Sequence, residues 1–488
     1  FQAEDGIRDR SPSRGLGDVY KRQLQSLPAD LSLGQREAIA GVLGSRDRIS
    51  ALQGAAGTGK TTVLEHVRKQ AEQNGYEVLA VAPTVSAVAE LSKAGFPKAT
   101  TVSRLLVDTT LHSKSDRRLL LIDEAAMIGS KTLHGLLTGP AAAFGRVLLV
   151  GDTRQLHSVD AGDAMRLLQR ESTLKTVHLE QIFRQRGALK NALERLRHDP
   201  RGGFEDLAAL GAVRQTSPGT VLDDAVDQYV KWDMDSRRGA KGSAMLAVAP
   251  TWAEIEAFTG RVRDRLRGAG TVGSGISIRR LKPLNWTIGD KKQVEAYRAG
   301  QVLVFHKATK EVGKDEAVTV TGVKNGRIQA TRASGQTVTL TGKQAKAFGV
   351  FAGEIIDVAP GDRLLLQGNR RAPKRTPSKS GPLAARLGWK PFSAKNGELV
   401  TVKSVSLREG LIRLSDGRVI PKDYRQLVHG YAVTTYASQG KTVDRVMVLG
   451  ARMSHEHFYV AATRARDTVA VYTPDRERFA DSPVSYTH

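Results

Sequence analysis

The stretch Gly54-Ala55-Ala56-Gly57-Thr58-Gly59-Lys60-Thr61-Thr62 decides the local fold of this 488-residue chain. It fits the pattern G-x-x-x-x-G-K-[ST] of a phosphate-binding loop, which joins a strand to a helix. Residues 49–53 before it predict a short buried strand, and residues 61–73 predict a helix. A glycine-rich turn that merely joins two elements is the alternative. The fixed Lys-Thr pair and its flanks favour the phosphate loop.

The residue types of this loop predict its ligand. Glycines allow the loop to curl so that backbone N–H groups point at phosphate oxygens, and the helix N-terminus adds a favourable partial charge. We expect all nine residues to line a nucleotide site, with Lys60 reaching the β- and γ-phosphates of ATP. The Thr61 hydroxyl is expected to bind Mg²⁺. ATP and Mg²⁺ are therefore the predicted cofactors.

Two adjacent carboxylates follow the next strongly apolar run. Residues 119–122 predict a buried parallel strand, and Asp123 and Glu124 come directly after it. At the end of a strand, Asp123 can hold Mg²⁺ directly or through water, and Glu124 can polarise an attacking water. A hydrolase is indicated, although a kinase or a transporter subunit could share this pair.

Further segments follow in a fixed order. A strand predicted over residues 147–150 runs into Gly151-Asp152-Thr153-Arg154-Gln155-Leu156, where Gln155 is placed to sense a γ-phosphate. The remaining segments are Ile182-Phe183-Arg184-Gln185, Tyr431-Ala432-Val433-Thr434-Thr435-Tyr436-Ala437-Ser438-Gln439-Gly440-Lys441-Thr442, and Tyr459-Val460-Ala461-Ala462-Thr463-Arg464-Ala465-Arg466.

This ordered set of motifs resembles superfamily 1 DNA helicases of the RecD-like, 5′-to-3′ branch. The segments 300–313, 359–364 and 429–432 make the chain more similar to the helicase part of conjugative relaxase-helicases of the TraI/TrwC (MobF) type. The resemblance covers about residues 24–482. It implies an α/β fold of two RecA-like P-loop NTPase domains, with a β-rich, SH3-like insertion in the second.

The resemblance also implies roles for residues outside the phosphate loop. Arg464 matches the arginine finger of the family, and Arg184 matches a second arginine that contacts the γ-phosphate. Gln35 matches an upstream glutamine that contacts adenine. Gln439 and Gly440 are assigned to the nucleotide site. Lys60, Asp123, Glu124, Gln155, Arg184 and Arg464 thus form the predicted catalytic set, with Thr61 and Asp123 as the metal ligands.

A DNA track across both domains is implied as well. Its predicted residues are Pro83, Thr84, Thr100, Thr101, Thr434 and Thr442. Short hydroxyls suit phosphate contacts, which fix position without reading sequence. Trp252 and Trp286 are candidates for base stacking, with burial in a core as the alternative. Residues 370–395 carry eight Lys or Arg and no Asp or Glu, which suits either a strand-contacting loop or a solvated one.

The expected domain limits follow from these motifs and from a change in composition. The first domain is placed at residues 24–200, with a short 1B element near residues 107–116. The second is placed at residues 201–275 plus 425–481. Between its parts, residues 276–424 hold short β-type runs separated by Asn-Gly and Asp-Gly turns, which predicts a β-rich 2B-type insertion. The tetrapeptide Val-Ala-Pro-Thr occurs at 81–84 and at 248–251, which indicates that the two domains are built alike.

The ends of the chain are excluded from fold reasoning. Residues 1–23 and 482–488 resemble translated sequencing-adapter read-through, and an ordinary disordered terminus is the alternative. A relaxase domain, if the parent gene encodes one, is expected upstream.

Composition narrows the class of protein. The formal net charge is +24, and a polyanion partner explains such an excess most simply, although basic ribosomal or membrane-surface proteins show the same statistic. Cysteine is absent, which excludes disulfides and thiolate chemistry and agrees with the bacterial cytoplasm as the expected location. No apolar run is long enough for a membrane-spanning helix, so no membrane insertion is expected.

The predicted function is an ATP-hydrolysing, 5′-to-3′ single-stranded-DNA translocase and helicase, the motor part of a conjugative relaxase. Its expected partners are single-stranded DNA, duplex junctions, and the relaxosome with type IV secretion coupling proteins. A stand-alone RecD-like repair helicase is one alternative. A DNA-binding scaffold with a vestigial ATPase is another, and the intact catalytic set argues against it.

Overall fold

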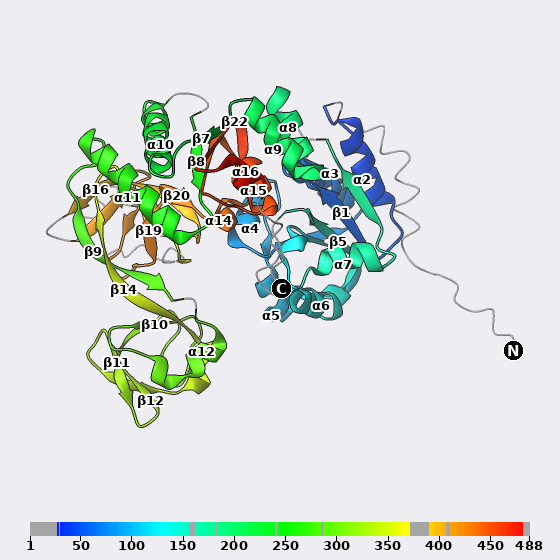
Figure 1. Cartoon of the computed structure of the whole chain (residues 1–488). Coiled ribbons are helices and arrows are strands. Elements are labelled where there is room, and N and C mark those ends of the chain that lie inside the picture. Colours follow the sequence, from blue (N-terminus) through cyan, green and yellow to red (C-terminus); the bar gives the residue numbers. More distant parts are fainter. Residues whose placement is uncertain are drawn as a thin grey trace. The chain divides into compact units, whose positions relative to one another are not determined.

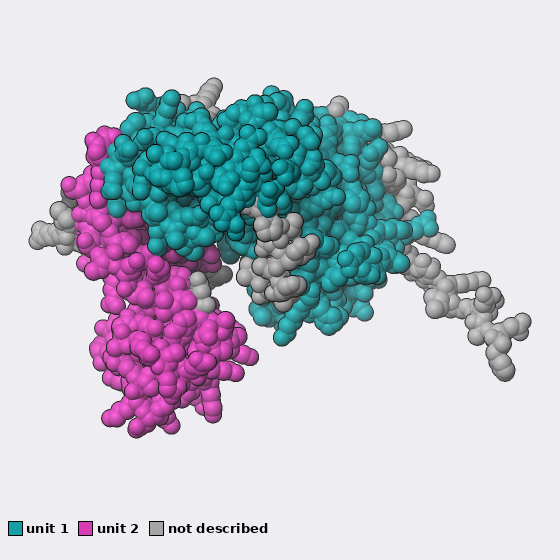
Figure 2. Space-filling model, in the orientation of Figure 1, with its two compact units in different colours: residues 1–265, 431–488 teal, residues 266–430 magenta. Residues whose placement is uncertain are grey.

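The computed structural model describes residues 27–28, 30–155, 162–181, 184–239, 243–284, 286–370, 390–406 and 410–481. The suspected artefacts at 1–23 and 482–488 lie outside these ranges, as do Leu156, Ile182–Phe183 and residues 371–389 of the basic segment. Two compact units make up the chain: residues 1–265 with 431–488, and residues 266–430 (Figure 2). No helix among the described residues is long and apolar enough to cross a membrane.

A six-stranded parallel sheet forms the first half of the larger unit, in the order β3-β2-β4-β5-β1-β6. Its strands are β1 Ile49–Gly54, β2 Glu77–Ala82, β3 Thr100–Thr101, β4 Ser115–Ile122, β5 Phe144–Gly151 and β6 Thr176–Leu179. Alternate residues of the same strand enter different cores: Leu119 and Leu121 pack in one, Leu120 and Ile122 in the other. Helices must therefore cover both faces.

The covering helices divide between these two cores. Helices α2 (Leu33–Gly44), α3 (Lys60–Gln73) and α4 (Val85–Lys93) supply buried residues to the first core. Helices α5 (Val102–Val107), α6 (Ser130–Thr138) and α7 (Ala164–Glu171) supply the second, with the short turns η2 (Thr109–Leu111), η3 (Ala125–Met127) and η4 (Pro140–Ala143) between elements. Because the sheet is parallel, all its strands end at one edge, where the phosphate loop lies.

A second parallel sheet forms the other half of this unit, in the order β20-β8-β21-β22-β7. Its strands are β7 Val213–Gln215, β8 Met245–Val248, β20 Ala432–Val433, β21 Val443–Leu449 and β22 Ala465–Thr473. Its helices are α10 Val221–Arg237, α11 Trp252–Gly268, α14 Thr435–Ser438, α15 His455–Ala462 and α16 Arg476–Ala480; α8 Gly187–His198 and α9 Pro200–Ala209 precede them (Figure 1).

The repeated Val-Ala-Pro-Thr sequence occupies equivalent places in the two sheets. It spans the ends of β2 and β8, and a helix begins directly after each copy, at Val85 and at Trp252. The predicted α/β class with two P-loop-type parallel sheets is confirmed. The chain leaves the second sheet after α11 and returns to it at β20, so the intervening β-rich region is an insertion.

The smaller unit contains two antiparallel sheets, in the orders β13-β12-β11-β10-β14-β9 and β18-β17-β16-β15-β19. The first comprises β9 Ile276–Pro283, β10 Val302–Phe305, β11 Ala317–Lys324, β12 Arg327–Arg332, β13 Thr337–Leu340 and β14 Phe348–Val358, with α12 Ile288–Lys292, η5 Val294–Ala296 and η6 Gly342–Lys346. The second comprises β15 Arg363–Leu366, β16 Glu398–Ser406, β17 Leu411–Leu414, β18 Val419–Ile420 and β19 Leu427–His429.

Each of these sheets has its own hydrophobic core, so the insertion is built around two cores. The β9–β14 ribbon, visible in Figure 1, supplies both: Ile276 and Val358 at one end, Phe348 and Val350 at the other. The predicted Asn-Gly turn joins β11 to β12, with Asn325 at φ 52° and Gly326 at φ 64°. Two positive φ angles are what a two-residue hairpin turn requires. The SH3-like character of the insertion and the limits of the domains stay predictions.

Candidate functional site

The phosphate loop leaves backbone N–H groups available at the start of α3. Strand β1 ends at Gly54, and α3 begins at Lys60. Gly57 and Gly59 have φ angles of 83° and 79°, which favour glycine, and Gly59 caps α3 without any side-chain hydrogen bond. The first N–H groups of a helix need an acceptor from outside. A phosphate suits this place both in charge and in hydrogen bonding.

Lys60 lies across the loop. Its ammonium donates to the carbonyl oxygens of Gly54 at 2.6 Å and Ala55 at 3.4 Å, and the Thr58 hydroxyl donates to the Ala55 carbonyl at 2.9 Å. Ala55 and Ala56 are buried, whereas Thr61 and Thr62 are exposed at the start of α3. The ammonium is thus held beside the loop, and the Thr61 hydroxyl is accessible to a cation.

The acidic pair follows β4, as predicted. The Glu124 N–H donates to Asp123 Oδ1 at 2.9 Å, and Glu124 has the left-handed backbone angles φ 51°, ψ 38°. Burial, and then the charge of Glu124, raises the pKa of Asp123 to about 7, while the Lys60 ammonium opposes the rise. A left-handed non-glycine residue is strained, and such strain concentrates at functional sites.

The oxygen atoms of the Asp123 carboxylate and the Thr61 hydroxyl suit a hard divalent cation. No cluster of three or more metal-ligating carboxylate or imidazole side chains occurs among the described residues. Mg²⁺ commonly takes only one or two protein ligands and completes its shell with phosphate oxygens and water. The half-buried Asp123 carboxylate would gain from a neighbouring positive charge, and with the Thr61 hydroxyl it makes a donor set of that kind.

Asp152 accepts hydrogen bonds from a side chain of its own loop after β5 and from a side chain on β1. Gln155 Nε2 donates to its Oδ2 at 2.9 Å, and Gln53 Nε2 donates to its Oδ1 at 3.1 Å. Gln169 Nε2 on α7 donates in turn to Gln53 Oε1 at 3.2 Å. Gln53 directly precedes the phosphate loop, so the network joins that loop to Gln155. Sequence reasoning missed Gln53 and Gln169; a polar residue in an apolar strand is the only signal that Gln53 offers.

The second half supplies Arg464, at the turn between α15 and β22. This side chain is 3% exposed, and it donates to the Val460 carbonyl at 2.9 Å and to Thr463 Oγ1 at 3.3 Å. Arg184, from the first half, donates to the Thr463 carbonyl at 2.7 Å. Burial, and then the nearby Arg464 guanidinium, lowers the pKa of Arg184 to about 9. An anion between two such cations would relieve their repulsion.

The structure therefore brings the predicted catalytic residues of both halves together. Glu124 acts electrostatically on Arg184 and on Arg464, and Lys60 acts on Asp123. Gly57 also lies against Arg184, since a Cβ added at Gly57 would stand 2.6 Å from the Arg184 Cβ.

Two glutamines predicted for the nucleotide site differ in their surroundings. Gln35 is buried in a capping box, where Ser32 N donates to its Oε1 at 3.1 Å and its own N–H donates to Ser32 Oγ at 3.3 Å. Its adenine contact stays a prediction. Gln439 is 9% exposed, and neither end of its amide has a hydrogen-bond partner among the described residues. Such a group costs free energy until a polar ligand pairs with it. Gly440 beside it is exposed, with φ 76°.

The predicted DNA-track threonines cap helices at the carboxyl ends of parallel strands. Thr84 Oγ1 accepts from Ala87 N at 3.1 Å, Thr101 Oγ1 from Arg104 N at 3.2 Å, and Thr434 Oγ1 from Ala437 N at 3.3 Å. A hydroxyl that accepts an N–H bond still has its own proton to donate. Pro83 and Thr100 precede two of the caps, and Thr442 precedes β21. Their contacts with DNA stay predictions.

The two candidate tryptophans differ in their exposure to solvent. Trp252 is 42% exposed at the start of α11. Trp286 packs against Tyr297, with ring centroids 4.9 Å apart, at the margin of a core of the smaller unit. Trp286 is therefore a packing residue, and only Trp252 keeps the exposure that base stacking needs.

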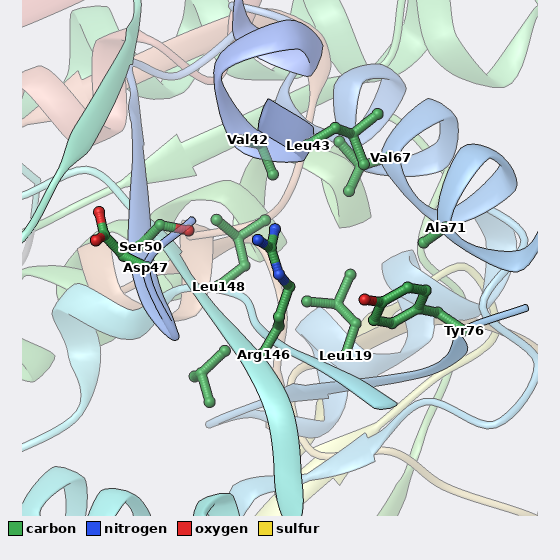
Figure 3. Close-up of a pocket in the computed structure, with 11 residues that line it drawn as sticks. Val42, Leu43, Asp47, Ser50, Val67, Ala71, Tyr76, Leu119, Arg146 and Leu148 are labelled. Atoms are coloured by element: carbon green, nitrogen blue, oxygen red, sulfur yellow. The ribbon is translucent and has the colours of Figure 1, made fainter. Parts of the chain in front are cut away.

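A pocket away from this site is part of the core. Figure 3 shows Arg146 among Val42, Leu43, Leu119 and Leu148, between α2, α3 and the sheet. Its guanidinium donates to the Ser45 carbonyl, and burial lowers its pKa. The lining contains none of the predicted site residues. The pocket therefore does not compete with the loop edge as the functional site.

Sequence comparisons agree with the motifs. A family model for the AAA domain matches residues 30–218. The multifunctional conjugation protein TraI of Escherichia coli K12 is 26% identical over 532 residues, covering 95% of this chain and 28% of that protein. The conjugal transfer protein TraA of Rhizobium radiobacter is 27% identical over 463 residues, covering 91% and 32%. The ATP-dependent RecD2 DNA helicase of Deinococcus radiodurans is 37% identical over 182 residues, covering 36% and 25%.

The resemblance to RecD-like superfamily 1 helicases related to TraI is confirmed by these relatives. The chain spans about a third, or less, of the length of the curated relatives it matches. Among solved structures, the Pif1 helicase from Candida albicans is similar with a TM-score of 0.44 at 16% identity, covering 92% of this chain and 96% of that one.

Proposed function

We propose that this chain is an ATP- and Mg²⁺-dependent motor that moves 5′ to 3′ along single-stranded DNA and opens duplex junctions. The observation that carries the proposal is the meeting of Arg184 and Arg464 beside the phosphate loop, because these side chains come from the two halves of the larger unit. A site assembled from two halves can convert hydrolysis into relative movement of those halves.

Each residue of the site has a chemical task in this proposal. Lys60 and the N–H groups of the loop bind the phosphates, and Glu124 orients the attacking water. Arg464 and Arg184 stabilise the charge that develops on the transferring phosphoryl group. Asp123 and Thr61 would hold Mg²⁺, which neutralises phosphate charge when bound. The unpaired Gln439 amide supports a polar ligand at this place.

The net charge of the chain and its similarity to known DNA-binding proteins support DNA as the substrate. The formal net charge of +24 favours a polyanion partner. Pif1 from Bacteroides has been solved bound to single-stranded DNA, at 14% identity and a TM-score of 0.42. Within the wider proposal the chain serves conjugative transfer, with the relaxosome and type IV secretion coupling proteins as partners, in the bacterial cytoplasm. The names of TraI and TraA support that assignment.

A stand-alone repair helicase is the second candidate. The 37% identity to RecD2 is higher than that to TraI or TraA, although it extends over only 182 residues. Both candidates are motors with the same site, so they differ in genetic context and partners. A scaffold with a vestigial ATPase is disfavoured, because Lys60, Asp123, Glu124, Gln155 and Arg464 are all present.

Strand displacement tests the proposal. The purified chain is expected to hydrolyse ATP faster when single-stranded DNA is added, and to release a labelled strand from a duplex with a 5′ tail but not from one with a 3′ tail. Omitting Mg²⁺ is the control. A chain whose hydrolysis ignores DNA, or which displaces only 3′-tailed substrates, contradicts the motor or its polarity respectively.

Lys441 directly precedes Thr442 of the predicted DNA track, and we expect its ammonium to contact a DNA phosphate there, which gives the proposal a pH dependence. Burial lowers the pKa of Lys441 to about 8, so its ammonium is charged at pH 7 and mostly neutral at pH 9. Contact with a DNA phosphate favours the charged form and raises that pKa. Affinity for single-stranded DNA is therefore expected to fall as pH rises from 7 to 9, by up to about tenfold for each pKa unit gained on binding.

The variant Lys441→Arg separates this effect from other titrations. An arginine stays charged throughout that range, so its binding should lose the pH dependence, whereas Lys441→Met should bind weakly at every pH. Fluorescence anisotropy at constant ionic strength measures all three proteins. Parallel curves for the parent chain and Lys441→Arg would rule out Lys441 as the titrating contact.

A further inference from the structure

Gln185 makes an unusual contact with the second half. Its side chain is 2% exposed, and its Nε2 donates to two backbone carbonyls, that of Thr463 at 3.2 Å and that of Ala465 at 2.5 Å. These carbonyls belong to the residues on either side of Arg464. A single amide group therefore fixes the backbone at the root of the arginine finger.

The residue before Gln185 connects the same place to the phosphate loop. Arg184 Nη1 also donates to the Thr463 carbonyl, and the Arg184 Cβ packs against the apex of the loop at Gly57. Gly57 holds φ 83° there, so a larger residue would be strained as well as crowded. A shift of the loop must therefore displace Arg184 and Gln185, and with them the backbone around Arg464.

The other end of the Gln185 amide is also informative. Oε1 is buried and has no hydrogen-bond partner among the described residues. A buried carbonyl without a partner is unfavourable, and an apolar side chain of the same size would avoid that penalty. The contact is therefore poorly explained as packing alone. The two bonds that Nε2 donates are what a glutamine provides here and a methionine cannot.

We propose that Gln185 is a positioning residue for Arg464, which transmits the state of the phosphate loop to the arginine finger. This inference rests on the proposed ATPase function. Gln185 touches neither phosphate nor metal in the proposal. It sets where the Arg464 guanidinium stands when ATP is bound, and small misplacements of a charged group of this kind lower rates strongly.

Steady-state hydrolysis with saturating single-stranded DNA tests the proposal. Gln185→Met keeps the volume and removes both donated bonds; it is expected to lower kcat for ATP hydrolysis by about tenfold to a hundredfold, with KM within about twofold. Gln185→Asn keeps the amide but withdraws it by one methylene, and an intermediate kcat is expected. Arg201→Ala is the control, since Arg201 is an exposed arginine that pairs with Glu477 and Asp481 on the surface. Its kcat should equal that of the parent.

A double-mutant cycle shows whether Gln185 acts through Arg464. In an Arg464→Lys background, Gln185→Met should lower kcat by much less than in the parent, because the finger it positions is already impaired. The affinity of the same variants for ADP with aluminium fluoride is measured as well. Gln185→Met should lower that affinity and leave the affinity for ADP without fluoride unchanged. An equal loss in both backgrounds, or an equal loss of ADP affinity, would mean that Gln185 is merely structural.

The two proposals fail in different ways. If the parent chain does not hydrolyse ATP in response to DNA, the proposed function is wrong. If the parent does so and a folded Gln185→Met matches its kcat, only the positioning role is wrong. Circular dichroism and thermal unfolding establish folding, and if Gln185→Met is unfolded, the same measurements on Gln185→Asn decide.

Discussion

Replacing Arg464 with alanine is expected to lower DNA-stimulated ATP hydrolysis by about 10³-fold or more, with ATP still bound. The guanidinium comes from the second half of the larger unit and has no part in the phosphate loop, so binding should depend on it less than turnover does. Its buried position, 3% exposed, keeps its interaction with phosphoryl charge unscreened by water. Single-turnover hydrolysis and equilibrium nucleotide binding separate the two effects.

Arg452→Ala is the matched control for this variant. Arg452 is an exposed arginine in the loop before α15, in the same half of the unit, so its loss changes net charge equally. Its hydrolysis should match that of the parent. If folded Arg464→Ala hydrolyses ATP at the parent rate with the same stimulation by DNA, the two-half motor is wrong, and a single-domain ATPase or a scaffold becomes the better account.

Replacing Lys60 with alanine is expected to act earlier, on nucleotide binding. The ammonium stands 2.6 Å from the Gly54 carbonyl, within the loop that receives the phosphates, and its loss leaves phosphate charge without its main cation. Removing one partner of a buried charge pair costs about 2–5 kcal/mol, so ATP affinity should fall by about 30-fold or more. Hydrolysis should collapse as well, and single-stranded DNA should still bind, because Lys60 is not on the proposed DNA track.

Lys69→Ala provides the control for Lys60→Ala on the same helix. Lys69 pairs with Glu65 at 2.6 Å on the surface of α3, where an ion pair contributes little. Calorimetric titration with a non-hydrolysable ATP analogue should give the parent affinity for Lys69→Ala and a much weaker one for Lys60→Ala. Equal affinities for these two variants would show that the loop binds nucleotide without its lysine, contrary to the proposed site.

The features that the sequence predicts well are those set by neighbouring residues. The loop at 54–62 is read from glycine spacing, and β4 and β5 from apolar runs that are buried on both faces. The turn at Asn325-Gly326 follows from the positive φ angles that these residue types tolerate. In each case the chemistry of a few adjacent residues determines the outcome.

Contacts between residues that lie far apart in the sequence cannot be predicted from neighbouring residues in this way. Gln185 and Thr463 are 278 residues apart, and nothing local shows that the amide of one reaches the carbonyl of the other. Gln169 has the same difficulty, since its partner Gln53 is 116 residues away. Gln35 was assigned from resemblance, and its capping bond with Ser32 became evident only from the helix start. The two cores of the insertion likewise depend on which strands pair.

The interrupted second sheet has a consequence for biosynthesis. Strand β8 ends at Val248, but the strands on either side of it, β20 and β21, begin at Ala432 and Val443. At roughly 5–20 residues per second, a ribosome needs about 10–40 s to supply them, and β8 waits that long without neighbours. The smaller unit pairs mostly neighbouring strands and can fold during this interval. Nascent chains in which residue 430 has left the ribosome but β20 and β21 have not should therefore hold a folded insertion beside an unfinished sheet, which is the form that chaperones would meet.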